Sequence, residues 1–432
     1  MSGDNIMRVH IKTYGCTLNQ ADSETIASVL EDNGIGLARC QAEADVAIIN
    51  TCTVKGQTSQ RILDALKGLS KAGKKMLVTG CMAGANQDLL EKYVPNASIV
   101  TTSNMPRIAD AAKSTFAGTR VVLNSYSRLD RLAFFKPGKD VIAKVVISEG
   151  CASSCSFCET RLARGPLNSF SEQRILDAIR CSVGNGAKEI QLTSQDVGAY
   201  GADTRTNIAA LMRKISELGG DFRVRVGMIN PVHMRRNFDE FVDALRSDRF
   251  YRFVHMPVQS GSDSVLDSMR RQYNVEEFEQ YVKDLRAAIP GITIETDIIV
   301  GFPTETESDF DRSIDFINRV RPEVTNISKF SARPNTLATK MKQHTNESIS
   351  ERSMRMSRAV RTVQHSINSR FIGESFDTLL TESNSKSFNG RNHSYRQIVI
   401  RREDVRPGMA LGSRCKARIT RVSANVLYGS VL

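Results

Sequence analysis

The 432-residue sequence lacks several features of membrane and exported proteins. No apolar run approaches about eighteen residues, so no membrane-spanning helix is predicted. The first residues, MSGDNIMRVHIKTYGC, contain no apolar stretch of the signal-peptide type, and the last, VLYGSVL, contain no hydrophobic anchor. We therefore expect a cytoplasmic protein without a membrane partner.

Two common catalytic motifs are also missing. There is no GxxxxGKS/T loop to support ATP-driven chemistry and no HExxH pair to support zinc-protease chemistry. The GIG at residues 34–36 is too short for a dinucleotide-binding fingerprint. The chain has nine cysteines, an odd number. In a reducing compartment they favour metal binding or catalysis over a disulfide framework.

Length and charge suggest several domains and a polyanionic partner. A chain of this length exceeds one ordinary core, so two or three domains are expected. The net charge is +12, and residues 371–432 hold 10 Lys and Arg against 5 Asp and Glu. This excess at one end favours RNA or DNA over an anionic membrane surface. Ordinary charge scatter is the simpler alternative.

Residues 1–115 alternate between short apolar runs and helical patterns. The apolar runs predict buried strands, and Asp or Ser starts with Gly stops mark the helices between them. The predicted strands cover residues 8–15, 45–51, 75–80 and 98–103, and the predicted helices cover residues 21–34 and 59–73. Strand–helix alternation predicts a doubly wound parallel sheet.

Three cysteines stand at the ends of the first three of these strands, namely Cys16, Cys52 and Cys81. Ligand sites in open parallel sheets form at the carboxyl ends of the strands, so these cysteines could converge in one crevice as metal ligands. The alternative is that they pack as small apolar residues. We expect the three cysteines that do not lie at strand ends to pack as small apolar residues; they are Cys40, Cys181 and Cys415.

A linker and a second strand–helix series follow. Residues 116–139 are basic and irregular, and we interpret them as the linker. In residues 140–371 the predicted strands cover 140–148, 189–196, 222–230, 253–261, 292–303 and 324–334, with helices at 171–185, 207–219, 235–247, 275–288 and 306–320. Six units are too few for a closed eight-fold barrel. A partial (β/α)6 barrel is therefore predicted, with its site at the carboxyl ends of the strands.

The pattern changes again toward the C-terminus. Residues 347–371 predict a helix with Arg352, Arg355, Arg358 and Arg361 at spacing three, hence one cationic stripe. A solvated face and a contact with RNA are equal alternatives for this stripe. Residues 372–432 alternate apolar and polar positions, with a turn predicted at NGRN, residues 389–392. Such alternation is typical of a small β-barrel.

Aromatic and basic residues of this small barrel are candidate RNA contacts. Tyr395 and Phe388 could stack on bases, because aromatic faces accept any base. The candidate cations around them are Arg391, Arg396, Lys416 and Arg418. The alternative is that part of this cluster forms the core of the small barrel.

The loop at residues 149–165, EGCASSCSFCETRLARG, contains Cys151, Cys155 and Cys158 directly after the first barrel strand. Thiolates hold iron–sulfur clusters, and a 4Fe–4S cluster has four iron corners. Three cysteines can bind three corners and leave one iron open for a ligand that is not protein. A structural zinc site is the alternative. The loop has no histidine, however, and its spacing is not that of a zinc knuckle or ribbon.

Polar residues at the barrel strand ends are candidate contacts to a bound small molecule. Gln195 and Asp196 end the second strand, and Gln259 ends the fourth. Asp297 lies within the fifth strand, where an acid needs a partner. It could contact the small molecule or pair with Arg225. Capping of helices or loop backbone is the alternative for the residues at strand ends.

The three-cysteine spacing, with Phe157 before the last cysteine and a βα barrel around it, resembles the radical S-adenosylmethionine superfamily. The resemblance implies a 4Fe–4S cluster on Cys151, Cys155 and Cys158, with S-adenosylmethionine chelating the open iron. Phe157 and the polar strand-end residues would contact this cosubstrate. Electron transfer would then cleave it and release a 5′-deoxyadenosyl radical.

Other segments are similar to the methylthiotransferase family and extend the resemblance over nearly the whole chain. They are TYGCTLNQADSE (13–24), NTCTVK (50–55), VTGCMA (78–83), HMPVQSGSDSVLDSMRR (255–271) and TDIIVGFPTETESDF (296–310). The small C-terminal barrel resembles the TRAM domain, an RNA-binding module. The resemblance implies a second 4Fe–4S cluster on Cys16, Cys52 and Cys81, whose open iron carries a sulfur.

Two further segments, CETRLARG (158–165) and TSQDVGAYG (193–201), resemble the archaeal and eukaryotic branch that acts on threonylcarbamoyladenosine. This resemblance implies an enzyme that converts N6-threonylcarbamoyladenosine at tRNA position 37, beside the anticodon, to its 2-methylthio derivative. The C2–H bond is not acidic, which is why the reaction needs a radical. The alternatives are the branches acting on isopentenyladenosine or on a ribosomal protein aspartate, and a non-catalytic RNA-binding iron–sulfur protein. The sequence identifies neither the electron donor nor the sulfur source.

Overall fold

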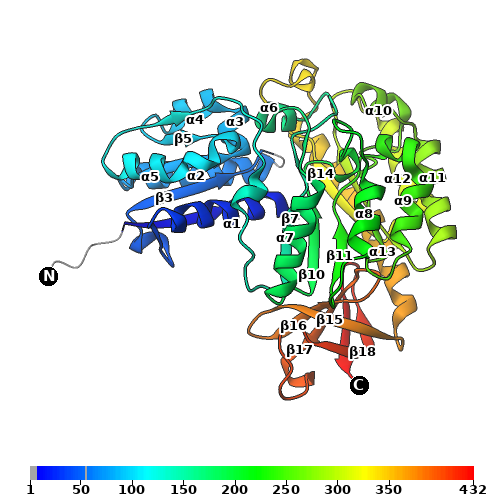
Figure 1. Ribbon diagram of the computed structural model, residues 1–432. Helices are drawn as coiled ribbons and strands as arrows, with labels where there is room; N and C mark the ends of the chain where they lie inside the picture. The colour runs from blue at the N-terminus through cyan, green and yellow to red at the C-terminus, as the bar shows by residue number, and fades with distance from the viewer. Residues whose placement is uncertain (1–6, 54–55) are drawn as a thin grey trace.

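The structure is a computed structural model that describes residues 7–53 and 56–432. Three units follow one another along the chain (Figure 1): an α/β unit in blue and cyan, an α/β barrel mainly in green and yellow, and a β-barrel in orange and red. The first unit lies beside the large barrel, and the last lies below it. The predicted fold class is confirmed. Within the described ranges, no helix is long and apolar enough to cross a membrane.

Six parallel strands form the N-terminal sheet in the order β2-β1-β3-β4-β5-β6. The strands are β1 (Arg8–Thr13), β2 (Gly36–Leu37), β3 (Val46–Thr51), β4 (Met76–Gly80), β5 (Ser98–Val100) and β6 (Val122–Leu123), and the helices are α1 (Thr17–Asp32), α2 (Gly56–Lys71), α3 (Cys81–Ala85), α4 (Gln87–Tyr93) and α5 (Ile108–Phe116). Ala47 and Ile49 of β3 pack with α2, whereas Ile48 packs with α1 and α5. The sheet is therefore covered on both faces, as a doubly wound sheet requires.

The large barrel is open and built from six parallel strands. Two three-stranded sheets, β7-β10-β11 and β12-β13-β14, are joined by a bridge between Val224 and Phe250. The strands are β7 (Ile142–Val146), β10 (Glu189–Thr193), β11 (Arg223–Val226), β12 (Phe253–His255), β13 (Thr293–Val300) and β14 (Val324–Lys329). The helices are α7 (Glu172–Gly184), α8 (Ile208–Ser216), α9 (Met234–Leu245), α10 (Asp263–Ser268), α11 (Val275–Ala288), α12 (Glu307–Val320) and α13 (Asn346–Asn368). The short antiparallel pair β8 (Ser148–Glu149) and β9 (Asn168–Ser169), with α6 (Thr160–Arg164) between them, brackets the cysteine loop.

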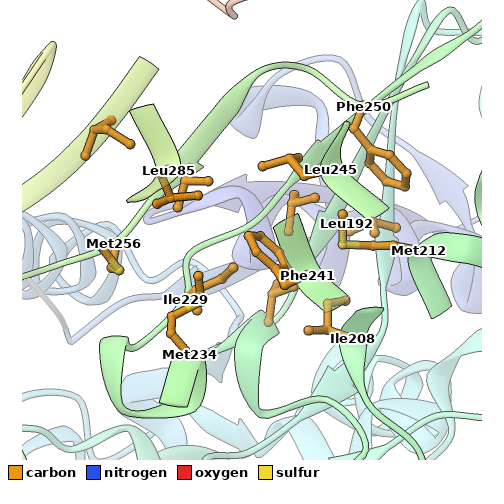
Figure 2. Close-up of a cluster of buried hydrophobic side chains, with 14 of the residues drawn as sticks. Leu192, Ile208, Met212, Ile229, Met234, Phe241, Leu245, Phe250, Met256 and Leu285 are labelled. Carbon is orange, nitrogen blue, oxygen red and sulfur yellow. The ribbon is translucent and has the colours of Figure 1, made fainter. Parts of the chain in front are cut away.

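The apolar core of the large barrel lies between its strands and the surrounding helices. Figure 2 shows part of this core, where Leu192 of β10, Met212 of α8 and Phe241 of α9 are buried together. Because side chains alternate along a strand, Gln191 points to the opposite side from Leu192. The outer face is thus apolar, and the inner face carries polar groups.

The C-terminal unit is a closed barrel in the order β15-β16-β17-β19-β18. Its strands are β15 (Ser375–Ser383), β16 (Ser387–Arg391), β17 (Gln397–Arg401), β18 (Arg414–Val422) and β19 (Leu427–Val431). Leu380, Ile398, Ile400 and Ile419 are fully or almost fully buried in its core. The residues that join it to the large barrel lie at the amino ends of the large-barrel strands, opposite the cysteine loop.

Two local predictions were wrong, in whole or in part, at this end of the chain. The NGRN segment is not a turn, because residues 389–391 belong to β16 and pair with β17. The predicted solvated stripe of α13 holds for Arg358 and Arg361, which are exposed, but is wrong for the other two arginines. Arg352 is buried and pairs with Glu305 at 2.7 Å, and Arg355 pairs with acidic residues of α12.

The interval interpreted as a linker is partly structured. Val122–Leu123 form the sixth strand of the N-terminal sheet, and a 3-10 turn, η3, covers Arg131–Phe134. Of the cysteines expected to pack, Cys415 is buried, but Cys40 and Cys181 are exposed.

Candidate active site at the strand ends

Cys16, Cys52 and Cys81 meet at the carboxyl ends of β1, β3 and β4. Cys16 is the N-cap residue of α1, Cys52 follows β3, and Cys81 begins α3. Asn19 of α1 donates to the Thr51 carbonyl at 2.8 Å, which ties the Cys16 turn to the end of β3. Burial raises the pKa of Cys81 to about 12, and the nearby Cys52 and Cys16 thiols add to the rise. The three cysteines therefore gather at one edge of the sheet.

Arg164 connects this triad to the loop that carries the other three cysteines. It ends α6, and its guanidinium lies 3.4 Å from the Cys81 sulfur through both Nε and an Nη. The same guanidinium pairs with Asp22 at 2.6 Å and with Glu149 at 2.9 Å. α6 packs directly on α3, and a Cβ at Gly84 would collide with the Ala163 carbonyl. The two units are therefore closely docked at this point.

Arg131 completes a buried network of two arginines and two carboxylates. Its guanidinium also pairs with Asp22 and Glu149, so each arginine contacts both acids. The side chains of Asp22, Arg131 and Arg164 are each 1% exposed. Burial alone would raise the pKa of Asp22, but the two guanidiniums hold it below its usual value. Breaking such a buried set leaves uncompensated charge, so the network fixes the position of the N-terminal unit.

Cys151, Cys155 and Cys158 occupy the loop between β8 and α6. Backbone hydrogen bonds hold this loop. The Cys158 amide donates to the Cys155 carbonyl, and the Cys151 amide donates to the Gly165 carbonyl, both at 3.3 Å. Burial raises the pKa of Cys151 to about 12, with further contributions from Asp196 and from the other two thiols of the loop. The predicted second triad is therefore also brought together.

Arg271 supports the cysteine loop from the barrel side. It donates to the Cys155 sulfur at 3.3 Å, to Asn230 Oδ1 at 2.8 Å and to the Tyr273 hydroxyl at 2.9 Å. Asn230 in turn donates to the Ser153 hydroxyl at 3.0 Å. These contacts hold the Cys155 side chain and its loop in a fixed position against the barrel.

The segments that carry the two triads are adjacent, since α6 packs on α3. Arg333 follows β14 and donates to Ser59 of α2 at 3.2 Å. Burial lowers its pKa, and the charges of Glu159, Cys52 and Cys158 oppose that effect, so it lies near members of both triads. Across the parts of the chain that the structure describes, no three His, Cys, Asp or Glu side chains are arranged around one metal ion. A cluster needs a different arrangement, because each thiolate binds its own iron corner.

The strand-end candidates lie on the same side of the barrel. Both side-chain polar atoms of Gln195 are buried without a hydrogen-bond partner among the described residues, as expected of a group that awaits a ligand. Asp196 accepts from the Asn230 amide at 3.1 Å and lies 3.2 Å from His233 Nε2. Gln259 has a φ of 75°, a left-handed conformation uncommon outside glycine. These residues border the cysteine loop and fit a polar cosubstrate.

Phe157 and Asp297 have protein partners. The Phe157 ring lies 6.4 Å from that of Phe302, edge to face. Asp297 sits inside the barrel, where it contacts His255 Nε2 at 3.0 Å and accepts from Asn326 at 2.8 Å. Its role in binding a small molecule stays a prediction.

The candidate RNA contacts divide into two groups. The Tyr395 hydroxyl donates to Glu189 at 2.9 Å, and its ring lies 4.7 Å from Tyr251, while Arg396 donates to Asn368 at 2.9 Å. These two residues join the C-terminal barrel to the large one and are not placed for base stacking. Arg391 lies over the Tyr395 ring, and Phe388 belongs to the barrel core. Lys416 and Arg418, by contrast, are exposed on β18.

Several site residues were not predicted from the sequence. Arg131, Arg164, Arg271 and Asn230 lie far along the chain from the atoms they contact, so spacing gave no signal for them. Arg164 is within the LARG segment that carried the family resemblance, which was the one available clue.

Two family models match the chain. One is described as an uncharacterized protein family, UPF0004, and matches residues 8–102, and the other is the radical SAM superfamily and matches residues 145–317. A radical S-adenosylmethionine methyltransferase from Kitasatospora setae has a similar fold, with a TM-score of 0.58 and 14% identity over 88% of this chain and 77% of that chain. Fold and site thus define a radical S-adenosylmethionine enzyme with a UPF0004 domain. This class implies a 4Fe–4S cluster and S-adenosylmethionine, and the UPF0004 domain suggests a second cluster.

Relatives that match almost the full length of this chain identify the family within this class. A probable threonylcarbamoyladenosine tRNA methylthiotransferase from Pyrococcus horikoshii is 35% identical over 99% of this chain and 100% of its own. One from Archaeoglobus fulgidus is 39% identical over 91% of this chain and 93% of its own. The human threonylcarbamoyladenosine tRNA methylthiotransferase is 33% identical over 91% of this chain and 69% of its own. The chain belongs to the threonylcarbamoyladenosine tRNA methylthiotransferase family, a family of radical S-adenosylmethionine methylthiotransferases.

Proposed function

We propose that this protein converts N6-threonylcarbamoyladenosine at position 37 of tRNA, beside the anticodon, to 2-methylthio-N6-threonylcarbamoyladenosine. The observation that carries the proposal is the presence of two cysteine triads on adjacent segments, in a chain of this family. One triad suffices for radical formation, and delivery of sulfur to the same carbon accounts for the second. The cytoplasm, which keeps thiols reduced, is the compartment we assign.

Cys151, Cys155 and Cys158 would hold the first 4Fe–4S cluster. When bound there with S-adenosylmethionine as methyl donor and radical source, such a cluster would supply the radical chemistry that an unreactive C2–H bond requires. Arg271 holds Cys155 and fixes the loop through Asn230. Gln195, with its unpaired amide, and Asp196 would orient the polar groups of the cosubstrate.

Cys16, Cys52 and Cys81 would hold the second 4Fe–4S cluster and present sulfur to the same carbon. Arg164 supports this assignment because its guanidinium contacts Cys81 from the loop of the first triad. It would keep the two sites at a constant separation. The buried Asp22 and Glu149 hold the arginine in place.

Lys416 and Arg418 are the residues we propose for tRNA contact. Both are exposed on β18, and phosphate contacts from exposed cations supply most of the affinity for nucleic acid. The barrel that carries them is fixed to the rest of the molecule, so tRNA bound there would have a defined orientation relative to the cysteine sites.

Nucleoside mass spectrometry of tRNA from a deletion strain tests the proposal. Loss of 2-methylthio-N6-threonylcarbamoyladenosine, with its precursor retained, is the expected result. Loss of a methylthiolated isopentenyladenosine, or of a ribosomal protein modification, would reassign the substrate. A purified, reconstituted protein that forms no 5′-deoxyadenosine would indicate a binding protein instead.

A further inference from the structure

A cavity of about 440 Å³ opens beside the cysteine loop, on the side of β10, β11 and β12. Ser153 and Ser154 of the loop form one wall, and the segment between β10 and α8 forms another. The start of α9 and the residues after α10 complete it. The cavity therefore lies at the strand ends, next to the first cysteine triad, and is large enough for part of a nucleoside.

The charge of this cavity is positive. Arg236, Arg270, Arg271 and His233 line it, and its described lining includes no Asp or Glu. Arg271 is already engaged by Asn230 and Tyr273, and His233 Nε2 lies 3.2 Å from an Asp196 carboxylate oxygen. Arg236 and Arg270 are exposed, and the described residues give neither guanidinium a hydrogen bond or ion pair. Two guanidiniums are thus available to an anionic ligand.

The backbone at both arginines departs from regular structure. Arg270 has a φ of 59°, in the left-handed region that a long side chain rarely adopts. Asn237, directly after Arg236, breaks the helical geometry of α9 with φ −136° and ψ 28°. The left-handed conformation of Arg270 costs roughly 1 kcal/mol or more, and such residues are found at ligand sites more often than elsewhere. Arg236 and Arg270 both line the same cavity.

We propose that Arg236 and Arg270 bind the carboxylate of the threonylcarbamoyl group of the substrate. This inference rests on the proposed function and identifies the residues that would give the enzyme its specificity for this substrate. A threonylcarbamoyl group differs from an isopentenyl group in carrying a free carboxylate, and guanidiniums pair with carboxylates through two parallel hydrogen bonds. Thr204, Thr206 and Asn207 supply hydroxyl and amide groups for the rest of the threonyl unit. The cavity would admit this base modification beside the first triad and gain nothing from an apolar one.

The test uses the full-length, reconstituted protein and two anticodon stem-loop RNAs of one sequence, with and without the threonylcarbamoyl group. Fluorescence anisotropy gives the affinity of each RNA for wild type and for the double variant Arg236→Gln/Arg270→Gln. The matched control is Arg235→Gln, on the same helix, whose arginine pairs with Glu277 outside the cavity. We expect wild type and control to prefer the modified RNA, and the double variant to lose about tenfold or more of that preference, about 1.4 kcal/mol. Its affinity for the unmodified RNA should stay within about twofold of wild type.

Three outcomes would overturn the inference. An equal loss for both RNAs would show that the arginines bind phosphates. Loss of S-adenosylmethionine binding by the double variant would assign them to the cosubstrate carboxylate. An unchanged preference would show that they bind neither. Conversion of the modified RNA by wild type, followed by nucleoside mass spectrometry, separates these failures from failure of the proposed function. A double Lys variant, which retains the charge, and thermal melting curves control for folding.

Discussion

At the scale of single residues, Arg164 is the side chain that links the N-terminal unit to the cysteine loop of the large barrel. One guanidinium contacts Cys81, Asp22 and Glu149, and it comes from the helix directly after the first triad. A lysine has one compact charge and cannot span three partners. The residue therefore couples the fold of the N-terminal unit to the position of the cysteine loop.

We predict that Arg164→Lys destabilises the cluster-free protein by about 3 kcal/mol, because it disrupts a buried ion-pair network. Thermal melting measures this. The variant should also let a thiol reagent reach Cys81 faster, which mass spectrometry of the labelled protein detects. Arg161→Lys, on the exposed side of α6, is the control and should change neither. Wild-type melting and labelling in Arg164→Lys would show that the network does not hold the domains.

His255 gives a prediction for pH. Burial alone would lower its pKa, but the hydrogen bond and charge of Asp297, with the charge of Glu295, raise it above the ordinary value, while Arg225 opposes them. The folded state therefore favours the protonated ring. Its stabilising effect is fully present below the unfolded pKa of about 6.5 and is lost as pH rises through the higher folded pKa.

His255→Gln should accordingly be less stable than wild type by roughly 1.5 kcal/mol below pH 6, since a hydrogen bond to a charged group is lost. The gap should narrow as pH rises above about 6.5. Melting temperatures of both proteins across this range measure the gap. A gap that stays constant or widens with pH would contradict the assignment.

At the scale of elements, the turn of residues 392–396 connects two units that the sequence treats as separate. The Tyr395 ring enters the amino end of the barrel between Tyr251 and Phe253, at 4.7 and 4.9 Å. Its hydroxyl bonds Glu189, and the neighbouring His393 carbonyl accepts from the Arg252 amide at 2.9 Å. The C-terminal barrel is thus fixed to the large barrel rather than tethered by a flexible segment.

Tyr395→Ala should lower stability by about 3 kcal/mol, as expected when a buried ring is removed. Tyr395→Phe keeps the ring contacts and should cost only about 1 kcal/mol for the lost hydrogen bond, because Gln191 and Tyr251 still donate to Glu189. Limited proteolysis should release the C-terminal barrel earlier from the alanine variant than from the phenylalanine variant. Identical melting and cleavage in all three proteins would mean that the turn does not fix the domain.

Strands that are buried on both faces of a sheet were predicted well from the sequence. Parallel strands covered on both faces read as continuous apolar runs, which is why β3 and β4 were located within a residue of their bounds. α1 was predicted to begin later than it does, because its N-cap residue is Cys16, whose side chain makes no capping bond. The turn predicted at NGRN was wrong because the prediction used only the local residue types. Pairing with β17 extends β16 through residues 389–391 of this segment.

The cysteines of the site could be predicted, but their surroundings could not. Strand ends and loop spacing are local properties, so both triads could be read from the sequence. Arg164 pairs with Asp22, 142 positions away, and Arg352 pairs with Glu305, 47 positions away. No local pattern records such partners. They become visible only in the folded structure.

At the scale of the whole molecule, the account assigns different tasks to the two triads. Under the proposed function, the triad in the barrel loop would serve radical formation, and the triad at the edge of the N-terminal sheet would serve delivery of sulfur to the same carbon. The buried arginines between the units keep the two segments docked. The C-terminal barrel would contribute tRNA contacts from the opposite end.

The most direct test of this division replaces Cys16, Cys52 and Cys81 together by Ala and reconstitutes the protein without oxygen. The variant should still cleave S-adenosylmethionine to 5′-deoxyadenosine in the presence of a strong reductant and should insert no methylthio group into tRNA. Circular dichroism and retained tRNA binding confirm that the fold survives. If the folded variant still methylthiolates tRNA, sulfur comes from elsewhere, and the division of tasks between the two triads is wrong.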